Sequence, residues 1–130
     1  MATTIKQLID KNKSSFDNSY FIESINLSYI LINKALKQIV KEDLKQEVID
    51  NKIKTSNLIS HIKKDLLLNP TLKSKLSKKV IKDIELFIEL YKSIFKELKF
   101  QYPEKKIHET SQLGINCIII LNTSLVKIKN

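Results

Sequence analysis

The chain has very little of several residue types on which compact folds often depend. It contains one glycine, two prolines and one cysteine in 130 residues. Sandwiches and barrels need many tight turns, which are built mainly from glycine and proline, so the composition argues against an all-β fold. A single cysteine excludes an internal disulfide framework and gives no cluster for a structural zinc site. A glycine-rich phosphate loop is impossible with Gly114 alone.

Arginine and tryptophan are both absent. The 23 basic residues are therefore all lysines, and with 14 acidic residues they give a net charge of +9. An excess of lysine can draw a protein to phosphate backbones, but lysine lacks the planar fork with which arginine grips a phosphate. The abundance of lysine, isoleucine and asparagine is also what AT-rich codon usage produces. Few aromatic residues argue against a stacking platform for single strands.

No apolar run is long enough to cross a membrane. The longest, Ile118 to Leu121 with Cys117 before it, is far shorter than the ~20 residues that a bilayer requires. The N-terminal segment MATTIKQLIDKNK lacks the charged-then-apolar order of a signal peptide. We therefore expect a cytoplasmic protein without a membrane segment, and no motif indicates a cofactor or a metal.

What the sequence does contain is helical periodicity. Apolar residues recur at alternating steps of three and four, and the pattern predicts helices over 4–11, 19–40, 55–66, 70–98 and 103–128, with 41–54 undecided between an extension and a short separate helix. Asn18 or Ser19 can cap the second of these helices. Its broad stripe predicts a central position, and its core residues are Phe21, Ile22, Ile25, Tyr29, Leu31, Ile32, Ala35, Leu36 and Ile39.

The fourth predicted helix is the longest. Asn69-Pro70 is a typical restart, and unbroken spacing from Leu72 to Leu98 predicts about thirty residues, or ~45 Å at 1.5 Å per residue. Pro103 ends this helix and can occupy the first turn of the next one. There Gly114 costs ~1 kcal/mol relative to alanine, which the close approach of a neighbouring helix would offset.

These segments predict an all-α fold, an antiparallel up-and-down bundle of four or five helices forming one domain over residues 1–130. The β-branched run Ile118 to Ile120 could be read as a strand, but no other segment would pair with it. No repeat, low-complexity stretch or change of composition indicates a domain boundary.

Four stretches resemble the HEPN family, the helical domains named for nucleotide binding in higher eukaryotes and prokaryotes. YFIESINLSYILINKALKQIV resembles the family's long helix, and KTSNLISHI resembles its Lys-Thr-His-Asp-Leu helix start, with Lys54, Thr55 and Leu58 in register. QYPEKKIH resembles an Arg-Tyr-Pro junction, and a final helix closes the bundle. The resemblance covers residues 15–128 and implies dimerisation, a nucleotidyltransferase or toxin–antitoxin partner, and binding of RNA or a nucleotide.

The departures from this family concern its catalytic residues. Its ribonucleases carry an arginine followed, after four to six residues, by a histidine; here Gln101 takes the arginine position and six residues separate it from His108. A neutral amide stabilises developing phosphate charge far less than a guanidinium does. Ser56 and Asn57 also replace the expected histidine and aspartate. The resemblance therefore favours a catalytically degenerate member over an enzyme.

Three kinds of candidate site remain. His108, with Gln101, is the catalytic candidate, although a partly exposed histidine at a helix terminus explains it as well. His61 and Cys117 are interpreted as structural, and the glutamates as solvated ion pairs with nearby lysines. The densest basic patch straddles the Asn69-Pro70 turn and comprises Lys63, Lys64, Lys73, Lys75, Lys78 and Lys79.

Three functions follow from these observations. The first is a non-catalytic, HEPN-like interaction module that forms a homodimer or binds a nucleotidyltransferase or toxin–antitoxin component. The second is a metal-independent ribonuclease that uses His108. The third is a non-specific nucleic-acid binder that acts through the lysine patch.

Overall fold

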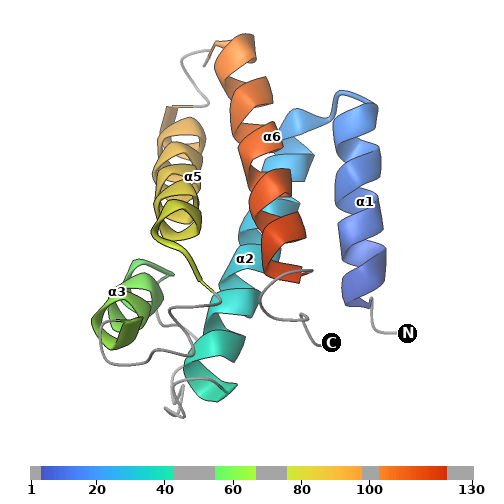
Figure 1. Cartoon of the computed structure of the whole chain (residues 1–130). Helices are drawn as coiled ribbons and strands as arrows, with labels where there is room; N and C mark the ends of the chain where they lie inside the picture. Colours follow the sequence, from blue (N-terminus) through green and yellow to red (C-terminus); the bar gives the residue numbers. More distant parts are fainter. Residues whose placement is uncertain (1–3, 43–54, 67–75, 98–102, 123–130) are drawn as a thin grey trace.

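The computed structural model describes residues 4–42, 55–66, 76–97 and 103–122. Within these ranges the regular elements are all helices: α1 (Ile5–Asp17), α2 (Phe21–Glu42), α3 (Thr55–Leu66), α5 (Lys78–Glu97) and α6 (Glu104–Ile120). In Figure 1, α1 and α5 run in one direction and α2 and α6 in the opposite one, while the shorter α3 lies at the lower end of the bundle. The predicted all-α bundle is confirmed, and Ile118 to Ile120 are helical.

The second helix, α2, is the central element, as its broad stripe predicted. It packs on α1, α3, α5 and α6, and its contacts with α6 and α1 are the most extensive in the structure. Six of its apolar side chains are fully buried, namely Ile25, Leu31, Ile32, Ala35, Leu36 and Ile39. Phe21, Ile22 and Tyr29 are half-buried.

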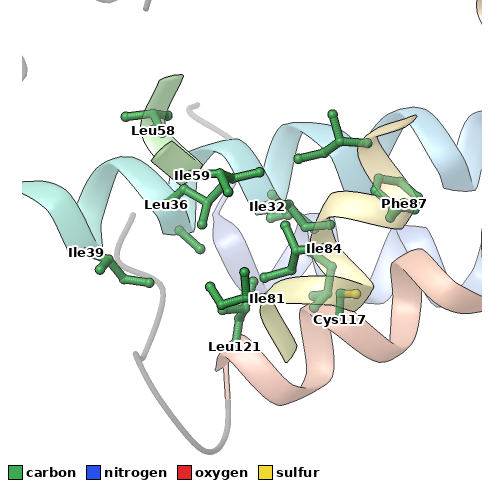
Figure 2. Packing of buried hydrophobic residues seen from close by; sticks show 14 of the residues in the cluster. Ile32, Leu36, Ile39, Leu58, Ile59, Ile81, Ile84, Phe87, Cys117 and Leu121 are labelled. Atoms are coloured by element: carbon green, nitrogen blue, oxygen red, sulfur yellow. The ribbon is translucent and has the colours of Figure 1, made fainter. Parts of the chain in front are cut away.

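The aliphatic core lies where α2, α3, α5 and α6 meet. Figure 2 shows Ile32 and Leu36 of α2 facing Ile81 and Ile84 of α5, with Leu58 and Ile59 of α3 on one side. Cys117 and Leu121 of α6 close the other side. Burial of such side chains stabilises the fold by roughly 2 kcal/mol each. The apolar spacing of 55–66 predicts an inward stripe of Leu58, Ile59, Ile62 and Leu66. The first three are buried, and the Leu66 side chain lies outside the described part of the structure.

The first helix is longer than predicted and ends at a sharp turn. A capping box starts it, because the Thr4 hydroxyl accepts the Gln7 N–H at 3.1 Å and Gln7 Oε1 accepts the Thr4 N–H at 2.8 Å. The prediction that Asn18 or Ser19 caps α2 is wrong. Asn18 instead closes α1, donating its side-chain amide to the Ser14 carbonyl at 2.8 Å, and Ser19 lies in the turn with a φ of 66°.

The prediction of one unbroken helix from 70 to 98 is also wrong. Leu76 and Ser77 are not helical, and α5 begins at Lys78, where the Ser77 hydroxyl accepts the Val80 N–H at 3.2 Å. Leu76 is nevertheless buried at 2% exposure. It therefore fits the apolar pattern because it is part of the core, although it is not in a helix. The proposed Asn69-Pro70 restart lies outside the described residues.

The last helix approaches α2 and α5 very closely. Pro103 stands just before it, and its carbonyl accepts the N–H groups of Lys106 and Ile107. A Cβ added to Gly114 would lie 2.5 Å from a ring carbon of Phe87 and 2.8 Å from the Cβ of Ser28. The predicted close approach is confirmed, and it explains why glycine is tolerated in mid-helix despite its cost. The sequence predicts one stripe on this helix that contains Ser111, Gly114, Ile118, Leu121, Leu125 and Ile128. The first four are buried, and Leu125 and Ile128 lie outside the described residues.

None of the helices just described combines the length and the apolar character that a membrane span would need.

Candidate functional site

His108 lies on the second turn of α6 and packs against an aromatic corner. Its ring centroid is 4.9 Å from that of Phe21, edge-on, and 5.3 Å from that of Phe16. The two phenylalanines are themselves 5.4 Å apart. Phe16 lies in the last turn of α1 and Phe21 begins α2, so the histidine joins the start of α6 to the α1–α2 turn. His108 as a whole is nevertheless exposed to solvent.

The groups around His108 do not form a catalytic set within the described chain. General acid–base catalysis needs an imidazole nitrogen aimed at the reacting group, with charged or polar partners converging on the same point. Among the described residues, this ring contacts the phenyl rings of Phe16 and Phe21. Thr110 donates its hydroxyl to the Lys106 carbonyl at 2.7 Å, and Ser111 is fully buried with no hydrogen-bond partner for its hydroxyl. Gln101 lies outside the described residues.

A buried polar seam, which the sequence did not predict, joins α1 to α2. The Ser24 hydroxyl donates to Asn12 Oδ1 at 2.5 Å, and Asn12 Nδ2 donates to the Ser28 hydroxyl at 2.8 Å. All three side chains have 1% exposure or less. Ser28 also faces Gly114, so α6 closes over this seam. Because buried polar groups are costly unless paired, these bonds fix the register of α1 on α2.

Thr55, the residue in register with the helix-start motif of the family that the sequence resembles, is buried and hydrogen-bonded between α3 and α2. It is buried at 3% exposure at the start of α3. Its hydroxyl accepts the Asn33 amide at 2.6 Å and lies 2.9 Å from the Tyr29 hydroxyl. Leu58, in the same motif, is in the core, and Asn57 is exposed. Lys54 and the Ser56 side chain lie outside the described part of the structure.

An aromatic stack links α2 to α5 beside Thr55. The Tyr29 and Tyr91 rings are stacked with centroids 4.0 Å apart and planes 10° from parallel, and Phe95 follows at 4.6 Å from Tyr91. Desolvation by burial, followed by the neighbouring Tyr29, raises the pKa of the Tyr91 phenol. Burial therefore favours the neutral form of the Tyr91 phenol. The stack joins two helices, and Phe95 extends it along α5.

The lysine patch is only partly described. Lys63 and Lys64 occupy the last turn of α3, and Lys78 and Lys79 occupy the first turn of α5. All four are exposed. Lys63 forms an ion pair of 3.3 Å with Glu85 of α5, so a neighbouring carboxylate offsets its charge. Lys73 and Lys75 lie outside the described residues, and the patch as predicted therefore stays a prediction.

A shallow groove of about 340 Å³ lies between α3 and α5. Ile59 and Ile88 line its apolar part, and the remaining lining residues are Ser60, Lys63, Glu85, Glu89 and Lys92. His108 is not among them. The glutamates were predicted to form ion pairs at the surface. Glu85 does so, but its partner is Lys63 of α3 rather than a lysine of its own helix.

Cys117 and His61 show no reactive environment. Cys117 is buried at 1% exposure, and burial, with a smaller contribution from Asp83, raises the pKa of its thiol to about 12. A neutral thiol is a poor nucleophile, as its interpretation as a core residue predicts. His61 is exposed on α3. Among the described residues, no three His, Cys, Asp or Glu side chains are grouped so that they could hold a metal ion.

Comparison with known proteins leaves the chain without an assigned family. No family model matches it, and neither a curated protein nor a solved structure is significantly similar to it.

Proposed function

We propose that this chain is a HEPN-like helical interaction module without nuclease activity. The observation that carries the proposal is the environment of His108, the only histidine in the ribonuclease-like junction. Its ring packs against Phe16 and Phe21, as a side chain that holds helices together would. A neutral amide at Gln101 in place of a guanidinium supports the same conclusion.

The placement of the motif residues supports the family part of the proposal. The long apolar helix is α2, at the centre of the bundle. Thr55 and Leu58 lie at the start of a helix that packs on it, and Pro103 stands at the start of the last helix. The polar residue of the motif, Thr55, is occupied by hydrogen bonds to α2. Binding partners of such a module are a second copy of the chain or, as the resemblance implies, a nucleotidyltransferase or toxin–antitoxin component.

An RNA cleavage assay tests the absence of nuclease activity. Purified wild-type protein and the His108→Ala and His108→Phe variants are incubated with structured and single-stranded RNAs, with and without a chelator. We expect the same background cleavage from all three proteins. Cleavage that is present in wild type and lost in both variants, while their circular dichroism is unchanged, would contradict the proposal and restore the ribonuclease alternative.

One observation favours nucleic-acid binding as a second candidate. Lys78 and Lys79 lie in the first turn of α5, and this turn contains no acidic residue. Cations at a helix N-terminus are disfavoured by the macrodipole by roughly 0.3–1 kcal/mol each. Helix stability therefore does not account for this pair, whereas attraction of a phosphate backbone would.

The matched test replaces Lys78 and Lys79 by glutamine and compares this variant with one carrying Lys6→Gln and Lys13→Gln on α1. If the pair binds phosphates, RNA affinity falls and the slope of log affinity against log salt decreases by ~1 to 2 in the first variant only. Equal effects in both variants would show that RNA binding depends on the net charge of the protein and not on Lys78 and Lys79 in particular.

A further inference from the structure

The turn between α1 and α2 is short and contains one residue in an unfavourable conformation. Asn18, Ser19 and Tyr20 alone separate the two helices. Ser19 has a φ of 66°, in the left-handed region that favours glycine. Its side chain is exposed, so packing of that side chain does not fix the conformation.

The backbone hydrogen bonds of this turn have equivalents in a continuous helix. The Asn18, Ser19 and Tyr20 N–H groups bond to the carbonyls of Ser14, Phe16 and Ser15. If the turn straightened, each N–H would meet the carbonyl four residues earlier. None of the three residues is glycine or proline, so a single helix from Ile5 to Glu42 is available to the sequence. Straightening removes the left-handed residue without leaving a donor unpaired.

The contacts between α1 and the other described helices can be supplied by another copy. Its main neighbours are α2 and α6. Asn12 bonds to Ser24 and Ser28, Lys11 pairs with Glu23 at 3.5 Å, and Phe16 packs on His108. Because these partners all lie on α2 or α6, an α1 from a second molecule would make the same contacts in the same slot.

The direction of the helices permits this exchange. α1 and α2 are antiparallel and join at one end of the bundle, where α6 begins (Figure 1). A straightened α1 would project from that end along the axis of α2. Two molecules related by a twofold axis at this end would each receive the partner's α1 in the orientation that its own α1 has in Figure 1.

We propose that two copies of this chain dimerise by exchanging α1 about the Asn18–Tyr20 hinge. Short hinges under strain favour such exchange, and exchanging an identical element is a low-cost route to a dimer. This inference rests on the proposed function in one respect, because it specifies the interface of the homodimer proposed there.

Two substitutions at one exposed position change the hinge in opposite directions. Glycine at position 19 is relaxed in the turn and poor in a helix, whereas alanine is strained in the turn and good in a helix. Since each dimer contains two hinges, sedimentation at micromolar concentration is expected to show dimerisation weakened by on the order of 10- to 100-fold in Ser19→Gly. Dimerisation is expected to strengthen in Ser19→Ala. The reverse order, or equal affinity in the two variants, would overturn the exchange.

Crosslinking shows which chain supplies α1. Cysteines replace the exposed pair in a Lys11→Cys, Glu23→Cys variant, which is then treated with a short bis-maleimide. The native Cys117 is buried and is not expected to react. The controls are the two variants that carry only one of the introduced cysteines. Exchange predicts a covalent dimer on a denaturing gel that neither control gives in comparable yield.

The other two outcomes have different meanings. A crosslinked single chain in a sample that sediments as a dimer would overturn the exchange and leave self-association through another face. A monomer at micromolar concentration in wild type and in Ser19→Ala would overturn both the exchange and the homodimer. The absence of nuclease activity is tested separately by the RNA assay.

Discussion

The two sides of α2 are built on different principles. The side that faces α3 and α5 is aliphatic, with Ile32, Leu36, Ile84 and Phe87 in one buried hydrophobic cluster. The side that faces α1 is polar at its centre, where Asn12 bonds to two serines. Aliphatic packing supplies free energy in proportion to the area buried but accepts many arrangements. Directional hydrogen bonds contribute less free energy and accept one register.

This contrast indicates what each side contributes. The α3–α5 side provides most of the stability, and the α1 side provides specificity for one partner helix. A polar seam of this kind suits an element that must find the same slot, in its own chain or in another. Substitutions at five sites, each with its controls, test the comparison in order of decreasing expected effect.

The aliphatic side is tested most directly at Phe87. Phe87→Ala removes a fully buried ring and is expected to lower the free energy of unfolding by about 4 kcal/mol, because it leaves a cavity. Chemical denaturation measures the change. Leu86→Ala, one residue earlier and 47% exposed, is the matched control and should cost under about 0.5 kcal/mol. Similar losses in both variants would refute the assignment of the buried face.

The polar side is tested at Asn12. Asn12→Ala leaves the buried hydroxyls of Ser24 and Ser28 without their partner, and we expect a loss of about 3 kcal/mol. Adding Ser24→Ala and Ser28→Ala should restore part of this loss, because no unpaired polar group then remains. A triple variant as unstable as the sum of the three single changes would show that the seam is not a coupled network.

The junction of the two sides is tested at Gly114. Gly114→Ala places a Cβ against Phe87 and Ser28, and overpacking of this kind outweighs the ~1 kcal/mol that alanine gains in a helix. We expect a net loss of about 2 kcal/mol in thermal or chemical unfolding. Asn116→Ala is the control at an exposed position on the same helix, and its effect on the free energy of unfolding should be close to zero. If Gly114→Ala instead stabilised the protein, α6 would have to lie farther from α2.

Cys117 tests the aliphatic side by pH. The folded-state pKa of its thiol is raised to about 12 from a reference of 9.0, first by burial and then by Asp83. The unfolded chain therefore loses this proton first, so the stabilising contribution is complete below pH 9 and falls as the pH rises towards 12. At pH 10 the loss is about 1 kcal/mol. Cys117→Ala should show a shallower fall between pH 8 and 10, and an identical slope would contradict a buried thiol.

The smallest effect is expected at His108. If its role is to pack against Phe16 and Phe21, His108→Phe should change the free energy of unfolding by less than about 0.5 kcal/mol. His108→Ala should lose about 1 kcal/mol, because the aromatic contacts disappear. The comparison uses chemical denaturation at neutral pH, and a large loss in His108→Phe would indicate a polar partner for the imidazole.

The sequence predicted those parts of the fold in which apolar spacing and burial coincide. The stripes of α2 and α3, the place of Gly114 and the start of α6 near Pro103 were all correct for that reason. The start of α5 was missed because Leu76 is buried without being helical, so its spacing continued the pattern across a bend. The length of α1 was missed because its inner face carries Asn12 and Ser15, which periodicity counts as exposed.

The candidate site was less accessible to sequence reasoning. His108 could be selected by residue type, but its neighbours Phe16 and Phe21 flank a turn that is far away in the sequence. Thr55 was selected by a motif, while its hydrogen bonds to Tyr29 and Asn33 depend on how α3 lies against α2. Polar pairs at large sequence separation leave no periodic signal. Serines spaced four residues apart, as at Ser24 and Ser28, were the available hint.

The contact of Gly114 with Ser28 has a consequence for how the protein is made. It joins the first long helix to the last described one, so α2 leaves the ribosome well before α6 exists to cover it. In that interval α1 covers one flank of α2, and the isoleucine- and leucine-rich face of α2 stays open to water. The nascent chain therefore presents a chaperone-binding surface until α6 has been translated.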